Sequence, residues 1–241
     1  MIKLVVSGAL GRMGQRIISL GEADGGFTLV GALERKDHPQ LGEKTAGVEV
    51  TSDPECIGLC DCIIEFTSPE ATIAHLDYTV AKNKAIVIGT TGLNQTQAVY
   101  IRQASEKIPI VCAPNMSVGV NLLFRLLGDA AKILKGYSVS VSEAHHIHKK
   151  DAPSGTAKKI AEIINAQGFD IKIENIEAVR EDEIVGDHRI VFESDVDKIE
   201  LFHHAKTRDI FVQGALVAAK WIVGKPAGLY SMSDVLFGAE T

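Results

Sequence analysis

Short apolar, strand-like runs alternate with helical segments through the first half of this chain, and this alternation limits the possible fold more than any other feature. Strands are expected at Lys3–Ser7, Phe27–Leu33, Asp61–Phe66, Ala85–Ile88 and Ile108–Cys112, and helices over 12–20, from Ser68-Pro69 onward, and over 94–106. A β-α-β-α order favours a parallel sheet that helices cover on both faces. The first half is therefore predicted to be an α/β domain.

A glycine-rich turn, G-A-L-G-R-M-G over 8–14, joins the first expected strand to the first expected helix. Glycines let the backbone approach a pyrophosphate, which then binds the N–H groups at the helix start. Leu10 replaces the middle glycine of the common G-x-G-x-x-G motif, and a helix packed tightly on a strand without a ligand is the alternative. Glu34 ends the next strand 20 residues beyond Gly14, where an acidic side chain accepts hydrogen bonds from ribose hydroxyls. Together these features predict a Rossmann-type dinucleotide site.

The choice between NADH and NADPH stays open, because Arg35 next to Glu34 could hold a 2′-phosphate. The loops 89–92 and 113–117 also follow expected strands, at the edge where open α/β sheets bind ligands, although each alone is consistent with an ordinary turn. We expect NADH and/or NADPH to contact Gly8, Ala9, Leu10, Gly11, Arg12, Met13, Glu34, Arg35, Gly89, Thr90, Thr91, Ala113, Pro114, Asn115 and Met116.

The pattern changes after about Asn115. Helical spacing covers Val118–Leu134 and Ile210–Val223, Tyr137–Glu143 alternates as a half-buried strand does, and residues 171–202 are mostly strand-like. Another helix is expected from Ser154. The second part is therefore predicted to be an α+β domain with a mostly antiparallel sheet.

The segment E-A-H-H-I-H-K-K-D-A-P-S-G-T-A over 143–157 carries the most specific chemistry. Three histidines and two lysines fall within 145–150, and Ser154 can cap the helix that follows. A helix N-terminus favours carboxylates, and the basic side chains add donors and positive charge. This combination predicts a pocket for a small dicarboxylate with an acid–base group beside it.

Three other interpretations of this segment remain. H-H-x-H could bind a metal, but no cysteine or matched carboxylate completes a site, so no metal is expected. The segment could be a solvated basic turn. It could also contact phosphate or nucleic acid, which the net charge of −6 and the missing aromatic platform disfavour.

The charge balance and the cysteines bear on partners and compartment. An acidic chain has little general affinity for nucleic acid or anionic membranes, so neither is expected as a partner. No stretch approaches the ~18 apolar residues that span a bilayer, and the apolar run after Met1 ends too soon for a signal peptide. The cysteines at 56, 60, 62 and 112 lack the spacing of a zinc site. We expect a cytoplasmic protein.

The motifs together resemble the dihydrodipicolinate reductase (4-hydroxy-tetrahydrodipicolinate reductase) family. The likeness covers the whole chain and rests on G-A-L-G-R-M-G, L-E-R, F-T-S-P, V-I-G-T-T-G, N-M-S-V-G-V-N, W-I-V-G-K-P-A-G-L-Y-S-M-S-D-V-L and above all E-A-H-H-I-H-K-K-D-A-P-S-G-T-A. The resemblance implies NAD(P)H-dependent reduction of 4-hydroxy-tetrahydrodipicolinate to tetrahydrodipicolinate in diaminopimelate and lysine biosynthesis. It makes His145 the acid–base residue, Lys149 the proton donor, and His146, Gly155 and Thr156 the ligands of the substrate carboxylates.

The resemblance also implies the domain organisation and assembly. Residues 1–116 and 209–241 would form a discontinuous dinucleotide-binding domain, and residues 117–208 a substrate-binding and oligomerisation domain. The sheet of this second domain would assemble a homotetramer.

Other functions predict other residues. A dehydrogenase acting on an amino-acid aldehyde would need a nucleophile such as Cys112, whose I-V-C-A-P-N context is that of a strand end. A redox-sensing regulator would carry a DNA-binding element, and no helix-turn-helix signature is found. A catalytically inactive relative is disfavoured because both His145 and Lys149 are present.

Overall fold

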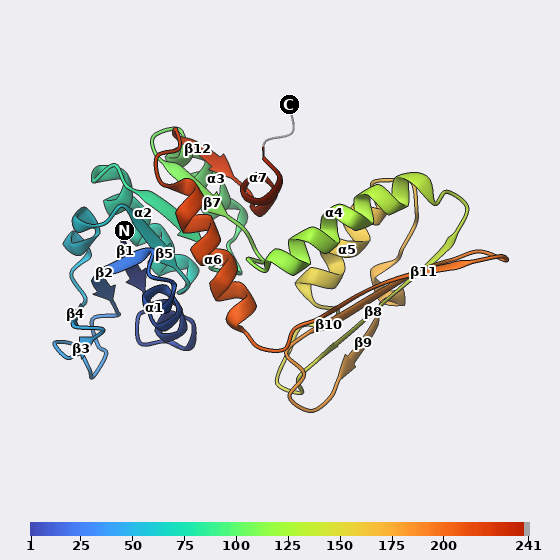
Figure 1. Cartoon of the computed structure of the whole chain (residues 1–241), viewed down its shortest axis with the longest axis horizontal. Helices are drawn as coiled ribbons and strands as arrows, with labels where there is room; N and C mark the ends of the chain where they lie inside the picture. The colour runs from blue at the N-terminus through green and yellow to red at the C-terminus, as the bar shows by residue number, and fades with distance from the viewer. Residues whose placement is uncertain (239–241) are drawn as a thin grey trace. The chain divides into compact units, whose positions relative to one another are not determined.

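The computed structural model describes residues 1–238, which form two compact units (Figure 1). The first consists of Met1–Ser117 and the segment from Phe211 onward, and the second of Val118–Ile210. Among residues 1–238, no helix is long and apolar enough to cross a membrane.

The first unit is built on an eight-stranded sheet in the order β12-β7-β6-β5-β1-β2-β4-β3, parallel except for the β3–β4 pair. Its strands are β1 (Ile2–Ser7), β2 (Phe27–Leu33), β3 (Lys44–Thr45), β4 (Val48–Thr51), β5 (Cys62–Glu65), β6 (Ala85–Ile88), β7 (Pro109–Cys112) and β12 (Gly228–Tyr230). Its helices are α1 (Arg12–Asp24), η1 (Pro54–Leu59), α2 (Pro69–Ala81), α3 (Gln95–Ser105), α6 (Asp209–Ile222) and α7 (Met232–Phe237). The predicted Rossmann-type sheet is confirmed.

Alternation along the strands creates two cores in this unit. Leu4 and Val6 of β1 face α1, α6 and α7, whereas Val5 faces η1, α2 and α3. Successive side chains of a strand point to opposite faces, so a strand with helices on both sides is apolar throughout. Figure 1 shows this three-layer arrangement.

The helix starts follow local capping chemistry. The Ser68 side chain accepts a hydrogen bond from the Ala71 N–H, and Pro69 is the first residue of α2, as predicted. Ser154 caps α5 (Gly155–Asn165) through the Ala157 N–H, which confirms the second expected cap.

The second unit packs two helices on one face of a four-stranded sheet of order β11-β10-β8-β9. β10 runs antiparallel to β8 and β11, while β9 runs parallel to β8. Besides α5, the elements are α4 (Val118–Ile133), β8 (Ser138–His145), η2 (Ile173–Asn175), β9 (Glu177–Arg180), β10 (Asp187–Glu193) and β11 (Lys198–His204). The predicted mostly antiparallel sheet is confirmed.

β8 ends two residues later than the sequence pattern predicts, at His145 instead of Glu143. Its last residues are held by neighbours distant in sequence, because Ala144 pairs with Asp187 and His145 with Arg180. His145 therefore lies on a strand end rather than in a loop.

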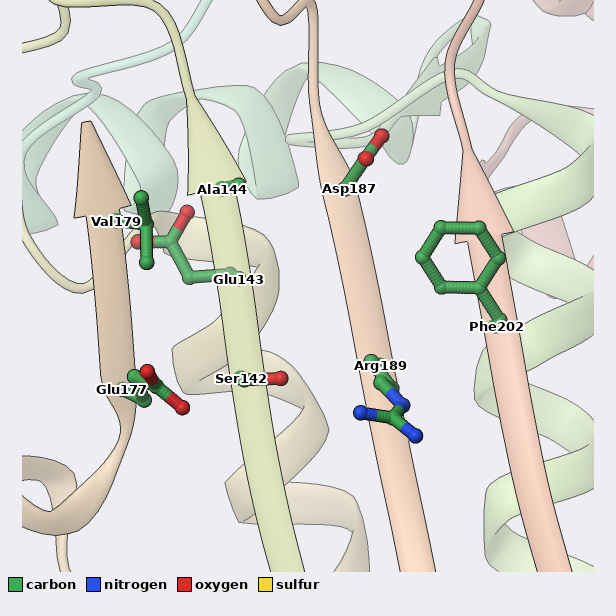
Figure 2. A pocket seen from close by; sticks show the side chains of 8 residues that line it. All are labelled: Ser142, Glu143, Ala144, Glu177, Val179, Asp187, Arg189 and Phe202. Atoms are coloured by element: carbon green, nitrogen blue, oxygen red, sulfur yellow. The ribbon is translucent and has the colours of Figure 1, made fainter. Parts of the chain in front are cut away.

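The other face of this sheet carries no helix of the second unit and has a shallow hollow of about 200 Å³ (Figure 2). Polar and apolar side chains mix there, including Ser142, Arg189 and Phe202, and Phe202 is 57% exposed. Their strand neighbours Val141 (next to Ser142 on β8) and Ile190 (next to Arg189 on β10) point the other way and pack in the core. The sheet thus presents one apolar face and one open, mixed face.

Replacing Gly214 by Ala should destabilise the first unit. A Cβ at Gly214 in α6 would lie 1.7 Å from the Met116 carbonyl oxygen, so the helix or the loop must shift. Such overpacking costs about 1–3 kcal/mol, and each kcal/mol lowers Tm by about 2–4 °C in a chain of this size. Gly21→Ala in α1 is the matched control, because its Cβ would meet its nearest neighbour at 3.7 Å. Equal melting temperatures for the two variants would contradict this packing.

Candidate active site

Loops expected to bind the cofactor gather at one edge of the eight-stranded sheet. β7, β6, β5, β1 and β2 lie side by side and run parallel, so the residues after them meet at the same edge. Gly8 follows β1, Glu34 follows β2, Gly89 follows β6 and Ala113 follows β7. The sheet brings these four positions, distant in sequence, to one place.

The glycine turn has the geometry that close approach of a phosphate requires. Gly8 has φ of +67°, and its carbonyl accepts a hydrogen bond of 2.9 Å from the Gly11 N–H. A Cβ at Gly14 would lie 2.0 Å from the Gly8 oxygen, so α1 packs directly on the turn. Gly11 precedes α1 and no side chain caps the helix, so its first N–H groups can bind an anion. The turn therefore fits a dinucleotide.

The remaining residues of the turn have different environments. Ala9 is fully buried and its N–H donates to the Leu33 carbonyl at 3.1 Å, which fixes the turn to β2. Arg12 and Met13 begin α1, and Arg12 is exposed.

Glu34 lies against the glycine turn rather than pointing away from it. Its Oε2 accepts a 3.1 Å hydrogen bond from the Leu10 N–H, and its Oε1 accepts one of 3.0 Å from the Arg35 N–H. The exposed Arg35 side chain forms an ion pair with Asp37 at 3.2 Å. A carboxylate at the turn is placed to accept hydrogen bonds from ribose hydroxyls.

The other two expected cofactor loops offer mainly backbone groups. Thr90 is 4% exposed, and its hydroxyl lies 2.9 Å from that of Thr72, so this side chain is engaged within the protein, whereas Thr91 is exposed. After β7, Ala113 and Met116 are buried, Pro114 is exposed, and the Asn115 side chain accepts a hydrogen bond from the Ser117 N–H.

In the second unit, His145 is joined to a buried glutamate. Glu143 and His145 lie two residues apart on β8 and face the same side, where the Glu143 carboxylate accepts a hydrogen bond from His145 Nδ1. A carboxylate partner fixes the proton on Nδ1 and leaves Nε2 as the acid–base atom. A Cβ at Gly186 would lie 2.9 Å from Nε2, so glycine there leaves room for the ring.

Arg180 completes the environment of this carboxylate. Its Nη2 lies 2.9 Å from Glu143 Oε1 and also donates to the Asp151 carbonyl, while its Nε donates to the Lys149 carbonyl. Burial by itself would raise the pKa of Glu143, but hydrogen bonds from His145 and Arg180 outweigh it and bring the pKa to about 2. Glu143 is therefore ionised, and Arg180 ties the histidine-lysine loop to it.

The start of α5 is tied to the same carboxylate. The Ser154 N–H donates to Glu143 Oε1 at 3.1 Å, and Gly155 then begins the helix with an exposed backbone, followed by Thr156. Lys149 Nζ lies 2.8 Å from Asp151 Oδ1. A cation, an acid–base imidazole and a helix N-terminus thus lie in one short segment.

Two further histidines continue from His145 across the sheet, His188 beside it and His203 beside His188. The His188 ring lies 5.3 Å from the His145 ring and its Nε2 lies 3.4 Å from Ser154 Oγ, while the His203 ring lies 6.2 Å from that of His188. Burial first, and the nearby His145 and His203 second, lower the pKa of His188 to about 3. The expected substrate ligand His146 is half-buried, and burial and Arg208 lower its pKa.

Sequence reasoning missed Glu143, Arg180 and His188 as functional residues. The two-residue spacing of Glu143 and His145 on an expected strand was an available signal, since such residues share a face. Arg180 and His188 carry no local signal, because strand pairing alone brings them to β8.

The structure also bears on the thiol alternative. Burial raises the pKa of Cys112 to about 11, so this thiol is protonated near neutral pH and is a poor nucleophile. Within residues 1–238, no three histidine, cysteine or acidic side chains are grouped as metal ligands.

Comparisons with known proteins cover nearly the whole chain. The family descriptions "Dihydrodipicolinate reductase, N-terminus" and "Dihydrodipicolinate reductase, C-terminus" match residues 2–116 and 119–236. The 4-hydroxy-tetrahydrodipicolinate reductases of Syntrophus aciditrophicus and Aquifex aeolicus are 42% and 41% identical to this chain, each alignment covering 98% of both proteins. A dipicolinate-bound dihydrodipicolinate reductase from Paenisporosarcina sp. TG-14 has a similar fold, with a TM-score of 0.81, 24% identity, and coverage of 96% of this chain and 97% of that one.

Acid should destabilise the second unit in the pH range between the pKa values of His188 in the unfolded and the folded chain. The pKa of His188 falls from 6.5 to about 3 on folding, so between these values the unfolded chain binds a proton that the folded unit excludes. The free energy of unfolding should then decrease by about 2 kcal/mol from about pH 6.5 to about pH 5. Urea unfolding at these pH values measures this decrease.

His188→Gln is the matched variant, because its amide keeps a polar group near Nε2 for Ser154 but does not titrate. Its unfolding free energy should depend less steeply on pH in this range. Equal slopes for the variant and the native chain would show that His188 is not the source.

Proposed function

This chain belongs to the dihydrodipicolinate reductase family, and we propose that its first unit binds the dinucleotide while its second unit binds and protonates the substrate. The chain is an NAD(P)H-dependent oxidoreductase that reduces 4-hydroxy-tetrahydrodipicolinate to tetrahydrodipicolinate in diaminopimelate and lysine biosynthesis. The roles of individual residues in this reaction are our proposals.

The observation that carries these roles is the single carboxylate that joins His145 to the start of α5. Glu143 accepts hydrogen bonds from His145 Nδ1, from Arg180 and from the Ser154 N–H. The imidazole and the helix N-terminus are therefore held in fixed positions by one buried group. Fixed donors of this kind stabilise charge without reorganisation during the reaction.

The net reaction takes up a hydride and a proton and releases water. A nicotinamide dinucleotide, when bound by the first unit, would supply the hydride. Gly155 and Thr156 at the start of α5, together with His146, bind the substrate carboxylates and hold the ring in place. Lys149 donates the proton, and His145 acts through Nε2 as the acid–base residue.

For the cofactor, the position of Glu34 favours NADH, because a carboxylate hydrogen-bonded to the turn repels a 2′-phosphate. Arg35 pairs with Asp37 in this structure, and that pairing must loosen before Arg35 can bind a phosphate. NADPH is therefore expected to bind when the Arg35 guanidinium has separated from Asp37.

The test is nucleotide oxidation with the substrate made in the cuvette by the preceding synthase from pyruvate and aspartate semialdehyde. Oxidation that requires both this chain and the synthase product supports the proposed function, and the ratio of the NADH and NADPH rates gives the preference. A folded protein that binds a nucleotide but oxidises neither would contradict it.

Lys149→Ala should lower kcat by about 10²–10⁴-fold, because it removes the proton donor. Its Kd for NADH should stay within about twofold, because the lysine lies in the second unit. Lys150→Ala is the matched control, since Lys150 is the exposed neighbouring lysine. Near-native turnover of Lys149→Ala, or an equal loss in Lys150→Ala, would contradict the assignment.

We also propose that the chain assembles as a homotetramer through the open face of the second sheet (Figure 2). That face mixes the exposed Phe202 with the charged pair of Arg189 and Glu200, whose atoms lie 2.6 Å apart. Light scattering on the purified protein should give about four times the chain mass, and Phe202→Asp should reduce it. A monomeric native protein would contradict the proposal.

We further propose a cytoplasmic location, which the free cysteines support. Cys56, Cys60, Cys62 and Cys112 are all free thiols, as expected where thiols are kept reduced.

A further inference from the structure

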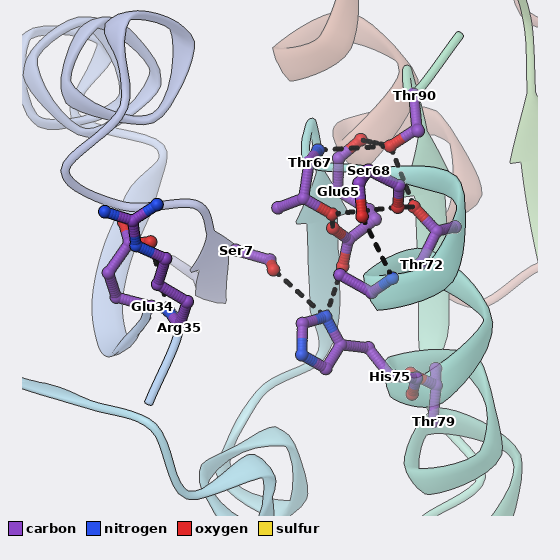
Figure 3. A network of polar contacts seen from close by, with 11 residues as sticks. Ser7, Glu34, Arg35, Glu65, Thr67, Ser68, Thr72, His75, Thr79 and Thr90 are labelled. Carbon is purple, nitrogen blue, oxygen red and sulfur yellow. Dashed lines mark hydrogen bonds and ion pairs between the residues drawn. The ribbon is translucent and has the colours of Figure 1, made fainter. Parts of the chain in front are cut away.

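A second buried glutamate lies at the sheet edge of the first unit that carries the expected cofactor loops (the cofactor edge). It has no part in the proposed reaction. Glu65 is the last residue of β5, and its side chain is fully buried. Its Oε2 lies 2.9 Å from Nδ1 of His75, which comes from α2, and its Oε1 accepts a hydrogen bond from the Thr67 hydroxyl (Figure 3). A buried carboxylate is stable only with such partners.

The arrangement has the composition of a nucleophilic triad but not its geometry. Ser7 Oγ lies 3.1 Å from His75 Nδ1, the same nitrogen that meets Glu65. A triad needs the hydroxyl and the carboxylate on opposite ring nitrogens, so that a proton can pass through the ring. His75 therefore joins β1 to β5 and activates no nucleophile.

The first consequence of this pairing reaches the glycine turn. Because the Thr67 hydroxyl is held by Glu65, its methyl group lies against Gly8, where a Cβ would come within 2.9 Å of Thr67 Cγ2. Ser7, bonded to His75, directly precedes Gly8. The Glu65–His75 pair thus contacts the turn through two separate side chains.

The second consequence reaches the loop after β6. A Cβ at Gly89 would lie 2.2 Å from the Phe66 ring, so this ring fills the space that glycine leaves. The Thr67 N–H donates to the Thr90 hydroxyl at 3.1 Å, and that hydroxyl also meets Thr72 of α2 (Figure 3). The segment 66–68 is therefore packed between the two loops.

We propose that Glu65 and His75 are positioning residues for the dinucleotide: through Thr67 they hold the segment 66–68 as a spacer that sets the glycine turn and the loop 89–91 at the separation the cofactor needs. This inference rests on the proposed function only in placing the dinucleotide at this edge. Neither residue needs to touch the cofactor, so the effect belongs to binding and not to the hydride step.

The test compares His75→Leu with His75→Asn. Leucine removes the ring nitrogen, whereas the asparagine amide keeps a polar group close to the position of Nδ1. His75→Leu should raise the Kd for NADH, titrated by its fluorescence without substrate, by about tenfold, a typical effect of losing one hydrogen bond to a charged group. With saturating NADH, kcat should stay within about twofold, and His75→Asn should recover most of the affinity.

Thr67→Val decides the outcome if His75→Leu does not fold. It replaces the hydroxyl with a methyl group and leaves Glu65 paired with His75, so the fold should hold while the Kd for NADH rises severalfold. Asp77→Asn is the matched control, because Asp77 lies on the same helix and bonds Tyr100 instead of the cofactor edge. Its Kd for NADH should be unchanged.

The outcomes separate this inference from the proposed function. If the native chain binds and oxidises NADH but His75→Leu and Thr67→Val keep its Kd, or lose kcat at an unchanged Kd, the positioning role is overturned and the proposed function stands. If the native chain binds neither NADH nor NADPH, the proposed function itself fails, and the inference fails with it.

Discussion

Each of the two units depends on burying a carboxylate at or near the end of a strand without leaving its charge unpaired. Glu65 is the last residue of β5 and Glu143 lies two residues before the last residue of β8, and both side chains are fully buried. In each case a histidine Nδ1 supplies one partner, His75 in the first unit and His145 in the second. Since an unpaired buried carboxylate would cost several kcal/mol, the segments that carry the donors must fold around it. That requirement fixes the positions of these segments.

The sequence indicated those parts of the site that local chemistry encodes. These features each act within a few residues of the chain, so the local sequence is enough to predict them. They are the glycines at 8, 11 and 14, the Ser68-Pro69 helix start and the Ser154 cap. β3 and β12 are two and three residues long, too short to produce a period, and they were not predicted. Arg180 reaches Glu143 only because β9 pairs with β8 across 37 residues. His75 has no distinguishing sequence signal, because its partners on β1 and β5 come close only when these strands pack with α2.

The two units meet opposite electrostatic demands within one acidic chain. The glycine turn offers uncapped backbone N–H groups to an anion, so it needs no basic side chain and is compatible with Glu34 beside it. The histidine-lysine segment instead concentrates basic side chains, and Arg180 offsets the charge of the nearby Glu143. A net charge of −6 therefore says little about either site.

The discontinuity of the first unit affects the order in which the protein can be completed during translation. α6 contributes Val212, Ala215 and Ala219 to the core beneath β1, and Met232 of α7 joins them. Until the ribosome has delivered these residues, one face of the parallel sheet has only α1 to cover it. The second unit is one continuous segment, 118–210, and all of its core residues emerge earlier. The second unit is thus expected to finish folding first, while one face of the first unit's sheet is still partly uncovered. Exposed apolar surface of this kind is where chaperones act on a nascent chain.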